Sequence, residues 1–172
     1  MKTLIVYYSQ SGNCEYIADQ LKEALKADTL GIKPVEAYPD SGAKKFLWGG
    51  KAAIMAEKPV LEEYQFDGDK YDLIIFGFPV WASNITPPIR TFIDDNREAL
   101  KDKKLACFVC LSGMGGDKAL TKAKEFLNID KFEARAKFID PLTRNKQENQ
   151  KELESFIQEL KNGPLRVNII GQ

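Results

Sequence analysis

The feature that most constrains the fold is a regular alternation of short apolar runs with longer segments of helical spacing. Five runs are rich in β-branched or aromatic residues and predict strands. They cover residues 3–8, 29–35, 71–76, 104–111 and 134–139. Elsewhere, apolar side chains recur three and four residues apart, which predicts helices. These segments are residues 13–26, 88–100, 117–127 and 146–161.

Strands that alternate with helices pair in parallel, because each crossover helix returns the chain to the same end of the sheet. The run at 104–111 is apolar along nearly its whole length, which is typical of a strand covered on both faces. We therefore predict an α/β fold, a doubly wound three-layer sandwich around a five-stranded parallel sheet of order 2-1-3-4-5. A chain of 172 residues suits one core, assigned to residues 1–162, with a tail over residues 163–172.

The second crossover is the least regular part of the pattern. Residues 42–57 predict a helix, but Trp48-Gly49-Gly50 interrupts it. Two interpretations of residues 48–51 stay open: an edge for a partner or substrate, or a loop tucked under the sheet.

The overall charge does not indicate a polyanionic partner. Lys plus Arg and Asp plus Glu both number 25, so we expect neither nucleic acid nor a membrane surface as a partner. The first residues lack the pattern of a signal peptide, and no apolar run approaches the roughly 20 residues that span a bilayer. These features predict a soluble, cytoplasmic protein.

The chain has no His and three Cys, and both facts bear on its chemistry. Without His, metal sites and His-assisted nucleophiles are disfavoured, so we expect no metal. Three cysteines cannot pair completely, which favours a reducing compartment. Cys107 and Cys110 are three residues apart on a predicted strand, so their side chains should point to opposite faces. We interpret them as core residues rather than a redox pair or a zinc site.

The loop after the first predicted strand is suited to a monophosphate. It contains Ser9, Gln10, Ser11, Gly12, Asn13 and Cys14. Hydroxyl groups and the free N–H groups of a helix start favour an anion, and the Gly-Lys-Ser/Thr of nucleoside triphosphatases is missing. An alternative fits this loop equally well, namely a turn whose side chains only cap the helix.

Two further loops follow the third and fourth predicted strands. The first offers a flat Trp ring to a planar ligand, and the second offers three glycines that let a backbone lie close to it. The candidate residues are Pro79, Val80, Trp81, Ala82, Asn84, Ser112, Gly113, Met114, Gly115 and Gly116. The alternatives are a Trp packed on a helix end and a plain flexible turn, with Asp117 as the N-cap of the next helix. In a parallel sheet all three loops should meet at one edge.

Taken in order, the three loops resemble the FMN-binding loops of the flavodoxin family, in its short-chain form, over nearly the whole chain. The resemblance implies FMN, with its phosphate in the first loop and its ring between the other two. It also implies an electron carrier whose redox chemistry takes place on the flavin, with no catalytic side chain. Its partners would be other redox proteins in transient contact, and it would be a monomer or a dimer.

Several residues depart from the family pattern. Cys14 stands where Thr or Ser is common, and Ala82 and Ser83 stand where many members have a Gly that stabilises the half-reduced flavin. Ala and Ser adopt positive φ poorly, so we expect this stabilisation to be weak. The net charge is zero, whereas typical members are acidic.

Two other functions stay open. The first is an FMN-dependent NAD(P)H:quinone-type reductase on the same fold. The second is a phosphate-responsive receiver domain, which has the same strand order. The receiver domain is disfavoured because Tyr8, Ser9 and Gln10 stand where it needs acidic residues.

Overall fold

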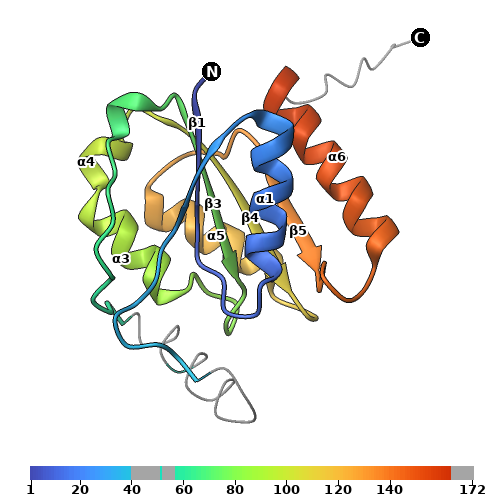
Figure 1. The fold of residues 1–172 in the computed structure, drawn as a ribbon, viewed down its shortest axis with the longest axis horizontal. Coiled ribbons are helices and arrows are strands. Elements are labelled where there is room, and N and C mark those ends of the chain that lie inside the picture. Colours follow the sequence, from blue (N-terminus) through green and yellow to red (C-terminus); the bar gives the residue numbers. More distant parts are fainter. Residues whose placement is uncertain (40–50, 52–56, 164–172) are drawn as a thin grey trace.

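A computed structural model describes residues 1–39, 51 and 57–163 of the chain (Figure 1). Five parallel strands form one sheet in the order β2-β1-β3-β4-β5, which confirms the predicted fold class and order. The strands are β1 (Thr3–Tyr7), β2 (Asp28–Gly31), β3 (Leu73–Pro79), β4 (Lys104–Leu111) and β5 (Arg135–Ile139).

Helices cover both faces of the sheet, as Figure 1 shows. Side chains of α1 and α6 pack on one face, and side chains of α3, α4 and α5 pack on the other. The helices are α1 (Asn13–Leu25), α3 (Pro87–Asp95), α4 (Arg97–Leu100), α5 (Gly116–Leu127), α6 (Lys146–Asn162) and the short 3-10 helix η1 (Gly68–Lys70). Within the described part of the chain, no helix has the length and apolar character needed to cross a membrane.

The core consists of two apolar clusters, one on each face of the sheet. Successive residues of β4 alternate between them: Cys107 and Val109 belong to the cluster under α3 and α5, whereas Phe108 and Cys110 belong to the cluster under α1 and α6. This alternation confirms that Cys107 and Cys110 are core residues on opposite faces. It also explains why the central strands are apolar without a two-residue pattern, because both of their faces are buried.

Several predicted boundaries differ from the observed ones. The strand predicted over 29–35 ends at Gly31, and the helix predicted over 88–100 is broken at Asn96. The Asn96 side-chain amide donates to the Phe92 carbonyl at 2.8 Å and to the Tyr64 hydroxyl at 2.9 Å. An Asn side chain that binds the backbone competes with helical hydrogen bonds, so the helix ends here and restarts.

The start of α5 also differs from the prediction. Gly115, with φ of 94°, is the N-cap, so the assignment of that role to Asp117 was wrong. Asp117 lies in the first turn, where its carboxylate accepts from Lys137 Nζ at 2.7 Å. The left-handed conformation of Gly115 starts the helix before the chain reaches Asp117.

Three sequence assignments fall wholly or mostly outside the described residues. They are the helix over 42–57, the segment 48–51 and the tail over 163–172.

A glycine in β3 generates the first prediction. Gly77 pairs with Phe108 across β3 and β4, and a Cβ on Gly77 would lie 2.1 Å from Phe108 Cζ. Phe108 is fully buried and has no room to move aside. We therefore expect Gly77→Ala to lower the free energy of unfolding by about 1–3 kcal/mol through overpacking.

Urea unfolding followed by circular dichroism measures this change. The matched control is Gly113→Ala, because nothing lies within 4 Å of that Cβ. Equal midpoints for the two variants would show that the Phe108 ring does not depend on the space at Gly77.

Candidate functional site

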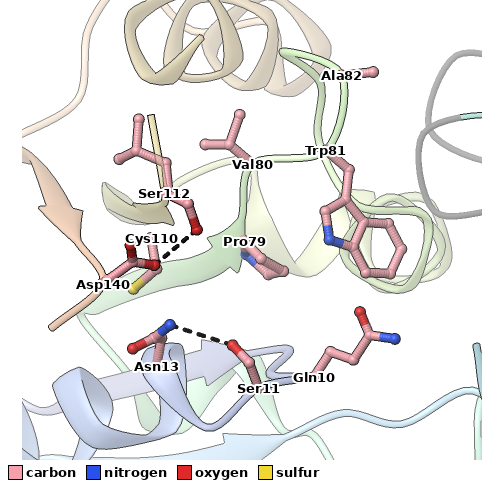
Figure 2. A pocket seen from close by; sticks show the side chains of 11 residues that line it. Gln10, Ser11, Asn13, Pro79, Val80, Trp81, Ala82, Cys110, Ser112 and Asp140 are labelled. Carbon is pink, nitrogen blue, oxygen red and sulfur yellow. Dashed lines mark hydrogen bonds between the residues drawn. The ribbon is translucent and has the colours of Figure 1, made fainter. Parts of the chain in front are cut away.

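A pocket opens at the carboxyl edge of the sheet, where the loops after β1, β3 and β4 meet (Figure 2). Its lining comes from these three loops, from the last residues of β4 and from the loop after β5. The lining residues are Gln10, Ser11, Asn13, Pro79, Val80, Trp81, Ala82, Cys110, Leu111, Ser112 and Asp140. Figure 2 shows Trp81 and Gln10 on one side of the pocket, and Ser112, Cys110 and Asp140 on the other. The parallel arrangement therefore brings the three predicted loops together.

The loop after β1 has hydrogen-bonding groups left to offer. Gly12, with φ of 86°, is the N-cap of α1, and no described side chain caps this helix start. The Ser9 hydroxyl is buried and has no hydrogen-bond partner among the described residues. Uncapped N–H groups carry partial positive charge and bind anions. The loop is therefore suited to a phosphate group, and the alternative of a side-chain cap is not what the structure has.

Ser11 and Asn13, two of the polar side chains of this loop, bond to each other. Asn13 Nδ2 donates to Ser11 Oγ at 3.3 Å, which Figure 2 shows as a dashed line. Asn13 Oδ1 accepts from the Leu142 backbone N–H at 3.1 Å. These contacts hold the first loop against the loop after β5, 129 residues further along the chain.

The loop after β3 turns sharply beside the pocket. Asn84 N–H donates to the Trp81 carbonyl at 2.9 Å, and the two residues between them have positive φ, 48° for Ala82 and 56° for Ser83. This is the pattern of a type I′ turn, which glycine or asparagine usually forms. Ala82 and Ser83 thus adopt positive φ here, although residues of these types do so poorly. The left-handed region costs such residues roughly 1–2 kcal/mol each, so the turn is strained.

Trp81 is fixed by two tyrosines. Its ring contacts Tyr8 edge-on at a centroid distance of 5.6 Å and Tyr38 edge-on at 5.2 Å. Gln10 Nε2 donates to the Pro39 carbonyl at 2.7 Å, so the segment around Tyr38 is held to the first loop. Burial, aided by the charge of Glu57, raises the pKa of Tyr38 to about 12, which keeps its hydroxyl neutral. No sequence signal pointed to Tyr38, because its place depends on the path between β2 and β3.

Asp140, in the loop after β5, is a pocket residue that sequence reasoning missed. Its carboxylate accepts from Ser112 Oγ at 2.7 Å and from Arg144 Nη2, and Ser112 and Asp140 face each other in Figure 2. Burial acts to raise the pKa of Asp140, but these two hydrogen bonds and the Arg144 charge outweigh it and lower the pKa. The sequence did carry a signal for this residue, because Asp140 directly follows a predicted strand whose carboxyl end lies at the same edge of the sheet as the three loops.

Cys110 also lines the pocket, as well as belonging to the core. Burial and hydrogen bonding to Cys14 raise its pKa, so its thiol stays neutral. Cys14 itself, in the first turn of α1, is buried in the cluster under α1 and α6.

The other predicted residues lie around the pocket without lining it. Asn84 is buried and bonds to Lys122 instead, with Lys122 Nζ 2.7 Å from Asn84 Oδ1. Gly115 lies against Ser83, and Met114 is 93% exposed at the tip of the loop after β4. The remaining predicted residues are Ser9 and Gly12 in the loop after β1, Gly113 in the loop after β4, and Gly116 at the start of α5.

Comparison with known proteins agrees with this architecture. A crystal structure of a flavoprotein from Lactobacillus acidophilus in complex with FMN is 24% identical, with a TM-score of 0.69 over 88% of this chain and 97% of that one. The apo form of the flavoprotein from Lactobacillus acidophilus is 26% identical, with a TM-score of 0.58 over 78% and 91%. Two-electron reduced flavodoxin from Megasphaera elsdenii is 19% identical, with a TM-score of 0.55 over 90% and 97%. Residues 2–159 match the family model of the flavodoxins, and the chain therefore belongs to the flavodoxin family.

Proposed function

We propose that this protein binds FMN in the pocket at the carboxyl edge and carries electrons between other redox proteins. The observation that carries the proposal is the uncapped start of α1 beside the buried Ser9 hydroxyl, which has no partner in the described part of the chain. Their chain neighbours Gln10, Ser11 and Asn13 line a pocket that has Trp81 in its wall. The FMN complex of the Lactobacillus acidophilus flavoprotein, which has the same fold, supports the choice of ligand.

The residues present fit FMN at both ends of the pocket. The phosphate would accept hydrogen bonds from the backbone N–H groups of the first turn of α1 and from the Ser9 hydroxyl. The ring would lie against Val80, Trp81 and Leu111, which exclude water. When bound, FMN supplies reversible one- and two-electron transfer, and the protein orients it.

The titratable side chains in the described lining leave the redox chemistry to the flavin. They are Cys110 and Asp140. The raised pKa of Cys110 keeps it a neutral thiol, and the Asp140 carboxylate is engaged by Ser112 and Arg144. Neither is poised as a general acid or base, and electron transfer through a bound flavin requires none.

The partners that suit this role are redox proteins that touch the open edge of the pocket briefly. The cytoplasm suits it as well, because Cys14, Cys107 and Cys110 are free and buried. The zero net charge favours one other function, a NAD(P)H:quinone-type reductase, since a chain without net negative charge attracts basic partner proteins less than an acidic carrier does.

Removing the Ser9 hydroxyl tests the phosphate end. We expect Ser9→Ala to weaken FMN binding about tenfold, through loss of one hydrogen bond to a charged group, and to leave riboflavin binding nearly unchanged. Quenching of flavin fluorescence on titration of apoprotein measures both affinities. Ser155→Ala, at an exposed position on α6, is the control and should change neither. Equal losses for FMN and riboflavin would place the phosphate elsewhere.

The electron count separates the carrier from the reductase. Stepwise reduction of the holoprotein should show at least transient absorbance of half-reduced flavin, because a carrier passes electrons singly. Oxidation of NADH or NADPH with a quinone should run no faster than with the same amount of free FMN. A single two-electron step together with rapid, saturable NAD(P)H oxidation would instead establish the reductase.

A further inference from the structure

The strained turn beside the pocket needs something to hold it. Ala82 and Ser83 both have positive φ, at 48° and 56°, in a turn without glycine. Backbone in this region persists only where the surroundings fix it. The contacts of the turn with the rest of the protein therefore decide its shape.

Asn84 provides the local contacts. Its N–H closes the turn on the Trp81 carbonyl at 2.9 Å, and its Nδ2 donates to the Ala82 carbonyl at 3.2 Å. Both bonds bind the chain to itself within three residues. On their own they leave the turn free to move as a unit.

Lys122 provides the distant contact. It lies on α5, and its Nζ donates to Asn84 Oδ1 at 2.7 Å, with Asn84 only 8% exposed. A hydrogen bond from a charged donor is about twice as strong as one between neutral groups, and a partly buried one is stronger still. The Asn84 amide is thus bound at both ends, with its oxygen on α5 and its nitrogen on the turn.

A second contact comes from the start of the same helix. A Cβ on Gly115 would lie 2.4 Å from Ser83 Oγ, so the missing side chain lets Ser83 pack directly against the N-cap of α5. Helix α5 therefore touches the turn at Gly115 and again at Lys122, about two helical turns later.

The shape of the turn sets one wall of the pocket, since Val80, Trp81 and Ala82 all line it. We propose that Lys122 is a positioning residue, which holds the Ala82–Ser83 turn in its strained form and so pre-organises this wall for the ligand. This inference rests on the proposed binding of FMN. In the apoprotein, the energy of the Lys122–Asn84 bond offsets the backbone strain.

The test combines loss of the bond with relief of the strain. Lys122→Met should weaken FMN binding about tenfold, whereas Lys118→Met, at an exposed position on the same helix, should leave it unchanged. Ala82→Gly removes the steric cost of positive φ at that residue. In the Ala82→Gly background the Lys122→Met loss should shrink to about twofold, because the turn then keeps its shape with less help.

A merely structural role gives a different result. If Lys122 only stabilises the fold, its loss costs the same factor in the parent protein and in the Ala82→Gly background, and such additivity overturns the proposal. Binding by Lys122→Met equal to that by Lys118→Met overturns it as well.

A ligand-free readout separates this inference from the proposed function. The emission of Trp81 in apoprotein with Trp48→Phe reports the wall directly. It should change on Lys122→Met and return on Lys122→Met with Ala82→Gly. If the parent protein does not bind FMN, the proposed function fails, whereas an unchanged emission in Lys122→Met overturns the role of Lys122 alone.

Discussion

The position of β3 between β1 and β4 is the constraint on which the site depends. The chain leaves β1 into α1 on one face of the sheet and leaves β3 toward α3 on the other, so the edge between these strands stays open. Backbone bonds seal the floor beneath the opening: Tyr8 N–H donates to the Gly77 carbonyl at 3.0 Å, and Val80 N–H donates to the Cys110 carbonyl at 2.8 Å. The loops that follow can only converge above this floor.

Hydrogen-bonding capacity is distributed unevenly around the opening. On the β4 and β5 side, Ser112, Asp140 and Arg144 satisfy one another. On the β1 side, Ser9 Oγ and Gln10 Oε1 are buried without partners among the described residues, and the first turn of α1 has no side-chain cap there. A ligand with one anionic end and one flat end therefore has a single favourable orientation, which follows from where the unsatisfied groups are.

Most of this fold could be predicted from the sequence, because two strong signals coincide. Long apolar strands identify β3 and β4, and helical spacing identifies α1, α5 and α6. The order of the strands follows from the way such units pack. The features that could not be predicted depend on single contacts: Asn96 breaks a helix through its side-chain bond to the Phe92 carbonyl, and Gly115 starts α5 before Asp117.

The same distinction applies to the candidate site. The three loops after β1, β3 and β4 could be located from the pattern of strands alone, but no local pattern places Tyr38 against Trp81. The positive φ of Ala82 and Ser83 could not be predicted from residue preference, because contacts with α5 outweigh the local conformational cost.

The bond between Asn13 and the Leu142 backbone spans 129 residues, and it has a consequence for how the protein matures during synthesis. A ribosome-bound chain that ends before β5 lacks Asp140 and Leu142, and with them the last loop of the pocket. A ligand that binds the native state alone stabilises that state by mass action. It would therefore stabilise finished chains and leave incomplete ones exposed to proteolysis, so that capture of the ligand marks the completion of folding.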